Sequence, residues 1–200
     1  MFRSLSGRLL ILTTIFVMLA EILIFVPSIA RFRVEYMMNR LERAQIASLT
    51  LLASEMIDPA LEAELLRTAE VFNVVLRRDE MRQLVLSSPM PQAIKATYDI
   101  RDASAMMLIR DAFIQLADTD DGVIRVIGAP VQDAGLLIEI TMETSALRMA
   151  MIDYGVRILA LSAAISLITA FLLFLTMRAF LLKPIKSVVG HMQNYALAPE

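Results

Sequence analysis

Arginines are the residues of this sequence whose type and spacing could do chemistry, because a guanidinium group binds phosphate and carboxylate groups through two parallel hydrogen bonds. Six of them lie in the middle of the chain: Arg77, Arg78, Arg82, Arg101, Arg110 and Arg125. Tyr98 lies close to Arg101 in the sequence, and with Arg125 these residues form a possible ligand contact in a sheet-lined pocket. The alternative is that the arginines are solvated edge residues of strands or touch anionic lipid headgroups. No ligand class follows from the residues.

Metal and thiol chemistry have weak support. The tract from Asp118 to Gly122 is acidic, but it lacks the D-x-D-x-D-G…E spacing of an EF-hand calcium loop and is interpreted as a turn. The absence of cysteine excludes a disulfide framework, a thiolate metal site and a catalytic cysteine. We therefore expect no catalytic residue, no cofactor and no metal ion in this chain.

Two apolar blocks, residues 9–30 and 158–177, account for a hydrophobic fraction of 58%, which is above the roughly 45–50% of soluble domains. About 20 residues are needed for a helix to cross a hydrocarbon core of about 30 Å, so both blocks predict transmembrane helices. The first could instead be a cleaved signal peptide that ends at Ala30, although its apolar run is longer than usual for one. The net charge of −2 gives no reason to expect nucleic acid as a partner.

The arginines and lysines that flank the blocks predict the orientation. Arg3 and Arg8 precede the first block, and Arg178, Lys183 and Lys186 follow the second. By the positive-inside rule both termini are cytoplasmic. Residues 1–8 are then a cytoplasmic start, residues 31–157 a periplasmic domain and residues 178–200 a second cytoplasmic segment of a multi-pass protein of the bacterial inner membrane.

Glu21 lies near the middle of the first block, where a charge is expensive. We expect it to be neutral or paired inside a helix bundle. The candidate partners are Ser162, Ser166 and Thr169 on the second block, or Glu21 of a second subunit. Its role is either a signalling contact or a neutral, hydrogen-bonded carboxyl group without one.

The middle domain begins and ends with helices in this interpretation. Residues 31–55 predict a helix that continues the first block. Its apolar positions are Val34, Met38, Leu41, Ile46, Leu49 and Ala53, and the charged Arg33, Glu35, Arg40 and Glu42 fill the gaps. A second helix should begin at Asp58 and Pro59. From about Ser145 a helix runs into the second block.

Between these helices the patterns predict two hairpins, a short strand and one more helix. The hairpins join residues 71–77 to 82–88 and residues 123–130 to 136–144, and the strand covers 96–100. The helix starts with Asp102 as its cap and ends near Ala117, with one face formed by Met106, Ile109, Phe113 and Leu116. The fold class is therefore α+β with a small antiparallel sheet. In its layout this domain resembles the PAS-like extracytoplasmic domains of bacterial sensors.

The segment after the second block is similar to the first helix of a HAMP linker, truncated at Glu200. The residues that carry this resemblance are Pro184, Ile185, Val188 and Met192, whose apolar spacing is that of a parallel coiled coil. Unlike the family, where Gly-Asp is common, the chain ends in Ala-Pro-Glu. HAMP linkers are dimeric, so the resemblance implies a homodimer in which Glu21 and these four residues transmit a signal.

The whole arrangement resembles the N-terminal sensor region of membrane-bound sensor histidine kinases, and the first 25 residues are similar to those of α-proteobacterial members. The resemblance implies a transmembrane input module that senses a periplasmic or membrane stimulus. A complete protein would use ATP and magnesium in a kinase domain that these 200 residues lack, and its partner would be a response regulator. His191 is not followed by the family's acidic residue and proline, so it is interpreted as a helix-surface residue.

Other outputs share the same input layout. A chemoreceptor or a cyclase would differ only beyond Glu200, and a stand-alone membrane adaptor would regulate its partner laterally. An enzymatic periplasmic domain is disfavoured, because the only histidine, His191, lies across the membrane from the folded domain in this interpretation.

Overall fold

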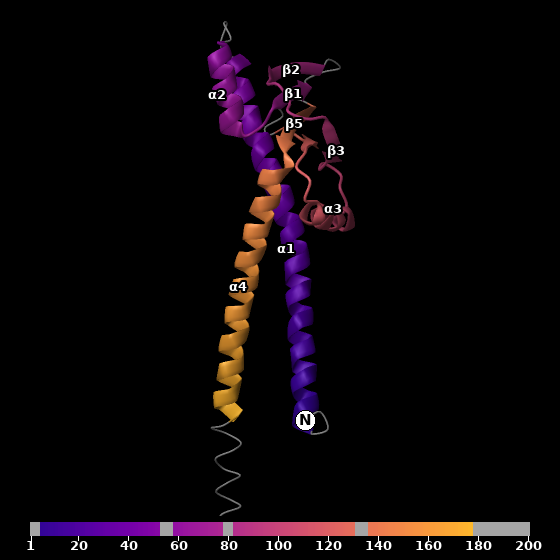
Figure 1. Ribbon diagram of the computed structural model, residues 1–200, viewed down its shortest axis with the longest axis vertical. Coiled ribbons are helices and arrows are strands. Elements are labelled where there is room, and N and C mark those ends of the chain that lie inside the picture. The colour runs from indigo at the N-terminus through magenta and orange to yellow at the C-terminus, as the bar shows by residue number, and fades with distance from the viewer. Residues whose placement is uncertain (1–4, 53–57, 78–81, 131–135, 178–200) are drawn as a thin grey trace, which may run out of the picture. The chain divides into compact units, whose positions relative to one another are not determined.

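The computed structural model describes residues 5–52, 58–77, 82–130 and 136–177, and within these ranges the chain is an α+β protein (Figure 1). Its helices are α1 (Leu5–Leu52), α2 (Pro59–Ala69), α3 (Ala105–Ala117) and α4 (Thr144–Met177). Its strands are β1 (Asn73–Arg77), β2 (Arg82–Ser87), β3 (Ile94–Asp99), β4 (Val123–Gly128) and β5 (Leu137–Glu143). The order of helices and strands matches the sequence prediction.

The chain forms two compact units. The helical unit consists of residues 1–21 and 157–200, and the sheet unit consists of residues 22–156. Two helices, over Ile15–Leu49 and Thr144–Leu172, are long and apolar enough to cross a membrane by length and composition. Only 11% and 6% of their most apolar windows are buried, which distinguishes them from the core helix of a soluble fold.

The sheet is mixed, and the prediction of an antiparallel sheet was wrong in this respect. The strand order is β2-β1-β5-β4-β3. The two predicted hairpins, β1 with β2 and β4 with β5, are antiparallel, but β3 pairs with β4 in parallel. The reason is α3, because a crossover helix between two neighbouring strands returns the chain to the end where the first strand began.

One face of this sheet forms the core of the sheet unit. The registers align Val74 with Ile140, Ile140 with Val126 and Val126 with Tyr98 across four strands. Val74, Val126 and Ile140 are buried, and Tyr98 packs against them. Because successive strand residues point to opposite faces, Thr97 and its partner Arg125 lie on the other side of the sheet.

The buried stripe of α1 differs from the predicted one. Leu41 is buried as expected, but Met38 and Ile46 are exposed by 47% and 66%. The buried residues recur every three or four positions, as a helix packed on a sheet requires: Ile29, Arg33, Met37, Arg40, Leu41, Ala44 and Ala47. Arg33 and Arg40, which the sequence placed in the gaps between the apolar positions, are therefore part of the buried stripe.

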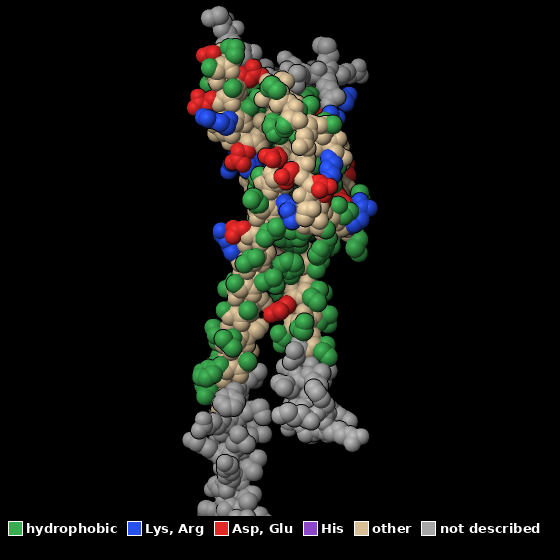
Figure 2. Space-filling view, viewed as in Figure 1, with side chains coloured by type: hydrophobic (Ala, Val, Ile, Leu, Met, Phe, Trp, Pro, Cys, Tyr) green, Lys and Arg blue, Asp and Glu red, His purple; other side chains and the backbone are tan. Residues whose placement is uncertain are grey.

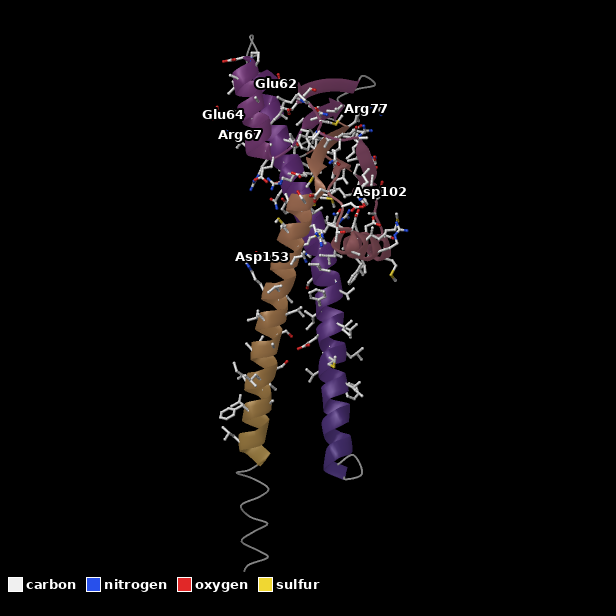
Figure 3. All side chains as sticks on the ribbon, viewed as in Figure 1. Glu62, Glu64, Arg67, Arg77, Asp102 and Asp153 are labelled. Atoms are coloured by element: carbon white, nitrogen blue, oxygen red, sulfur yellow. The ribbon has the colours of Figure 1, made fainter. Side chains whose placement is uncertain are left out.

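The start of α2 is confirmed. The Asp58 carboxylate accepts a hydrogen bond from the Ala60 amide at 2.9 Å, and Pro59 is the first helical residue. Glu62, labelled in Figure 3, accepts a hydrogen bond from the Ser87 amide and so joins α2 to β2. The helix ends at Ala69, and its C-cap Glu70 has a left-handed backbone with a φ of 55°.

The cap of α3 differs from the prediction. Ser104, and not Asp102, is the N-cap, and its hydroxyl accepts a hydrogen bond from the Met107 amide. Asp102 is an exposed residue in the segment before the helix (Figure 3). Ala112 and Gln115 are buried. Of the face named from the sequence, Ile109 and Leu116 pack against the core, whereas Met106 and Phe113 are exposed.

Candidate functional site

The most unusual group of the sheet unit is the buried guanidinium of Arg33 on α1. The residue is 1% exposed. Its guanidinium carbon lies 4.2 Å from the centre of the Tyr98 ring on β3, which is within the distance of a cation–π interaction. Tyr98 thus gives Arg33 a partner on the sheet, but the face of an aromatic ring does not take up its N–H groups as hydrogen-bond acceptors do.

Two N–H-bearing atoms of Arg33 lack a hydrogen-bond acceptor. Within the described residues, Nε and Nη2 are buried and have no partner. Burial lowers the pKa of the Arg33 guanidinium, and the nearby Tyr98 and Asp111 act in the opposite direction. An arginine stays charged at neutral pH, so the sheet unit carries a buried cation with unused donors, each of which costs about 1–3 kcal/mol.

Asp111 on α3 is the acidic residue whose charge acts on Arg33 and favours its protonated form. Its side chain is only 13% exposed, and its Oδ1 accepts hydrogen bonds from Nε and Nη2 of Arg110 at 3.1 and 3.0 Å. The Asp111 carboxylate therefore lies within the influence of two arginines but is hydrogen-bonded to one.

Arg40, seven residues after Arg33 on the same stripe of α1, has hydrogen-bond acceptors for its guanidinium group. It forms an ion pair with Glu70, donates to the Tyr36 hydroxyl at 2.7 Å and donates to the Ala69 carbonyl at 3.5 Å. Burial alone would lower the pKa of Arg40, but the hydrogen bonds to Tyr36 and Glu70 together raise it. Arg40 fixes α1 to the end of α2, beside a cavity of about 400 Å³.

Aromatic and small residues bring α1 and α4 together inside the sheet unit. Phe32 and Tyr154 stack with 4.2 Å between ring centres and 12° between planes. A methyl group placed on Gly155 would lie 3.4 Å from the Phe25 ring, an ordinary contact distance, so α4 has room for one carbon and little more at this position. Arg148 adds a link to α3, because its Nε donates to the Leu116 carbonyl at 3.2 Å.

The helical unit contains the polar contact that the sequence suggested for Glu21. Ser162 and Ser166 on α4 donate their hydroxyl groups to Glu21 Oε1 at 3.0 and 3.3 Å. Two of the three candidate partners therefore bind Glu21. Thr169 does not, because its hydroxyl donates to the Ile165 carbonyl of its own helix. Interhelical hydrogen bonds of this kind contribute about 0.6–1.7 kcal/mol in membrane proteins, so the contact is a modest but specific link between the helices.

The three predicted ligand contacts do not converge on one site. Tyr98 lies on the sheet face that packs against α1, where it contacts Arg33. Arg101 forms a two-pronged pair with Asp99, at 2.9 and 2.6 Å, which lowers the pKa of that carboxyl group. It also lines a cavity of about 220 Å³ beside α1. Arg125 lies on the opposite sheet face, 3.9 Å from Glu139.

The acidic turn after α3 holds an ion pair. Lys95 Nζ at the start of β3 lies 2.5 Å from Asp118 Oδ2, and this contact closes the crossover between the parallel strands. Among the described residues, no group of three or more histidine, cysteine or acidic side chains is placed to hold a metal ion. The predicted transmission residues Pro184, Ile185, Val188 and Met192 lie outside the described residues.

The chain has no match among known proteins in three comparisons. Neither protein-family models nor curated proteins nor solved structures give one. The function must therefore be argued from the residues and contacts of this chain.

The sequence analysis missed Arg33, Arg40 and Asp111. A signal for the first two was present, because Arg33 lies four residues from both Ile29 and Met37, and Arg40 lies next to Leu41. An arginine in phase with a buried stripe is a candidate for a buried cation. Nothing in the sequence pairs Asp111 with Arg33, because that relation depends on how α3 packs.

Proposed function

We propose that this chain is the transmembrane input region of a bacterial sensor histidine kinase. In this proposal α1 and α4 cross the inner membrane, residues 31–157 are periplasmic, and both termini are cytoplasmic. Residues 178–200 start a dimeric HAMP linker, and a kinase domain beyond Glu200 phosphorylates a response regulator. The kinase output rests on the resemblance of residues 178–200 to that linker.

The observation that carries the proposal is the continuity of α1 and α4. Each is an unbroken helix that contributes both to the core of the sheet unit and to an apolar segment. Ile29 and Met37 of α1 are buried in that core, as are Leu147 and Met151 of α4. A change of packing in the core therefore acts directly on the two helices that lead to the apolar segments.

The buried Arg33 allows two arrangements of α1 against β3 and α3 in this proposal. In one, its guanidinium lies over Tyr98 while Arg110 holds Asp111. In the other, a shift of α1 gives Arg33 the Asp111 carboxylate and releases Arg110. The unused donors of Arg33 reduce the stability of the first packing, so the two can differ by the few kcal/mol that a stimulus is able to overcome.

Glu21 would hold the two spans in register while the sheet unit switches. Its hydrogen bonds to Ser162 and Ser166 join α1 to α4, so that the spans move together and not independently. The movement would then reach Ile185, Val188 and Met192, which change their packing in the coiled coil of the linker.

The first experiment tests the topology. Protease added to spheroplasts should cut the chain between residues 60 and 140, and protease added to inverted vesicles should not. Cysteines introduced singly at Ile185 and Met192 should crosslink between two subunits in membranes, and the chain has no native cysteine to interfere. Cleavage of residues 60–140 from the cytosolic side only would overturn the proposal.

The second experiment tests signal transmission. Residues 1–200 are joined to the catalytic region of a HAMP-containing histidine kinase, and autophosphorylation is measured in membrane vesicles. Arg33→Met and Glu21→Ala should each change the rate. Arg67→Met on the exposed side of α2 is the matched control and should leave it unchanged. Wild-type rates in both test variants would exclude the proposed switch.

A further inference from the structure

α3 is an apolar helix with an unpartnered outer face. Its outer residues recur at helical spacing on one side, and their exposed fractions are large: Met106 76%, Met107 48%, Phe113 41% and Ile114 50%. Its inner face is also apolar, with Ala112 buried and Leu108 packed against the core. A helix that is apolar on both sides is stable on a protein surface only when something other than water covers the outer side.

α3 belongs to the same core as the part of α1 that contains Arg33, because Tyr98, which Arg33 covers, and Leu108 and Ile109 of α3 all pack against it. Asp111 of α3 acts electrostatically on Arg33, which is three residues beyond Ala30, the end of the first apolar block. Three residues of helix rise about 4.5 Å. The headgroup layer on each side of the hydrocarbon core is about 5–7 Å thick. If Ala30 marks the edge of the hydrocarbon, α3 lies at the depth of the headgroups.

α4 also exposes apolar residues within the same unit. Arg148 donates to the carbonyl of Leu116, and the next outward residues of α4 are apolar, with Met149 exposed by 68% and Ile152 by 43%. Figure 2 shows hydrophobic side chains gathered at the end of the sheet unit toward the long helices, near α3, and charged side chains scattered over the rest of the visible surface of this unit.

The charges of the outer face fit phospholipid. Arg110 lies between the apolar residues of this face, and its side chain is 65% exposed. Asp111 takes two of its donor groups, and a guanidinium has five N–H donors, so N–H groups remain for a phosphate. Apolar residues interleaved with arginine are typical of helices that lie in the plane of a membrane interface.

We propose that α3 is an interfacial helix that lies in the outer leaflet of the membrane and inserts Met106, Met107, Phe113 and Ile114 among the phospholipid headgroups. This inference rests on the membrane placement in the proposed function. The stimulus in this proposal is a change in the lipid surface. Because Asp111 lies on the same helix and acts electrostatically on Arg33, a change in the lipid surface that moves α3 would change the surroundings of the buried cation.

The test uses the full chain in nanodiscs of phosphatidylethanolamine and phosphatidylglycerol. Single cysteines at Met106 and Phe113 carry an environment-sensitive fluorophore, and lipids with a nitroxide on the headgroup or along the acyl chain act as quenchers. Glu64 on α2, exposed and labelled in Figure 3, is the control outside the membrane. Leu19 and Leu167, exposed apolar residues of the two blocks, are the control inside it.

Headgroup and upper-chain nitroxides should quench the labels at Met106 and Phe113 several-fold more than the label at Glu64. If Leu19 and Leu167 are quenched by deep nitroxides but Met106 and Phe113 are not, the interfacial helix is excluded and the membrane placement stands. If none of these four sites is quenched, the membrane placement itself fails. Protection of Met106 and Phe113 from lipid only in discs with two chains would identify a second copy as the occupant.

A variant supplies an independent measurement. Met106→Glu with Phe113→Glu changes exposed residues and should leave the helical content of the chain unchanged. It should also reduce the quenching of a label at Ile114 to the level found at Glu64. Unchanged quenching at Ile114 would mean that the apolar residues do not hold α3 at the lipid surface, and the proposal would be abandoned.

Discussion

Arg33 on α1 and Tyr98 on β3 lie with the guanidinium carbon 4.2 Å from the centre of the ring, and this contact joins the first helix to the parallel edge of the sheet. The same arginine has two buried donor atoms without an acceptor among the described residues. A cation–π interaction contributes about 0.5–2 kcal/mol, whereas each unused buried donor costs about 1–3 kcal/mol. The burial of Arg33 over Tyr98 therefore lowers the stability of the sheet unit, because the cost of the unused donors exceeds the gain from the cation–π interaction.

Arg33→Met should raise the free energy of unfolding of the sheet unit by about 1–3 kcal/mol, because it removes the unused donors and keeps the volume of the side chain. Chemical unfolding of the full chain in detergent, followed by circular dichroism, measures this change. Arg40→Met is the matched control and should lower the same free energy, because Arg40 has acceptors on Tyr36, Ala69 and Glu70. A loss of stability in Arg33→Met would contradict the interpretation.

Glu21 should couple energetically to Ser162 and Ser166. A double-mutant cycle of Glu21→Ala with Ser162→Ala and Ser166→Ala should give a coupling of about 0.6–1.7 kcal/mol, the range of interhelical hydrogen bonds in membrane proteins. The free energy of unfolding in bicelles is the measured quantity. Thr169→Ala is the control and should show no coupling, because its hydroxyl is bound to Ile165. Additive effects at both serines would show that the hydrogen bonds do not join the helices.

Gly155 should tolerate one methyl group and nothing larger. Gly155→Ala places a carbon at an ordinary contact distance of 3.4 Å from Phe25 and improves helix propensity by about 1 kcal/mol, so the melting temperature should stay equal or rise. Gly155→Leu should lower it, because overpacking costs about 1–3 kcal/mol. Equal melting temperatures for both variants would mean that α1 and α4 are not closely packed at this position.

The ion pair between Lys95 and Asp118 should make stability depend on pH in acid. Its hydrogen bond from Lys95 lowers the pKa of Asp118 below its ordinary value of 3.8. As the pH falls, Asp118 therefore takes up a proton at a higher pH in the unfolded chain than in the folded chain. The contribution of the pair to the free energy of unfolding is present above about pH 4 and is lost as the pH falls through the folded pKa. Asp118→Asn should therefore differ from the wild type at pH 7 and converge with it near pH 2. Unfolding curves across this range test the prediction.

The sequence was sufficient for most of the elements, because their signals are local. Asp58 with Pro59 marks the start of α2, and the alternation in residues 71–77 and 82–88 predicts the first hairpin. The parallel pairing of β3 with β4 could not be read in the same way. The direction of β4 depends on the end of the sheet to which α3 returns the chain. The packing of Leu108 and Ala112 of α3 against the core determines that end.

The contact of Glu21 with the serines, which two helices form, was predicted from the sequence. The surroundings of Arg33, which three elements form, were not. Glu21 and its serines follow from the cost of a carboxyl group in an apolar helix. Arg33 needs α1, β3 and α3 to be in place before its burial is visible. The sequence placed Met106, Ile109, Phe113 and Leu116 on one face of α3, but Ile109 and Leu116 pack against the core whereas Met106 and Phe113 are exposed. Periodicity alone does not tell which apolar residues of a helix are covered, because that depends on how the helix packs.

β5 and α4 adjoin without a connecting residue, since the strand ends at Glu143 and the helix begins at Thr144. β5 is also the central strand of the sheet. One extra residue at this junction would turn everything after it by about 100°. The junction therefore sets the rotational phase of α4, and any chimera that exchanges the sheet unit must be cut there without adding or removing a residue.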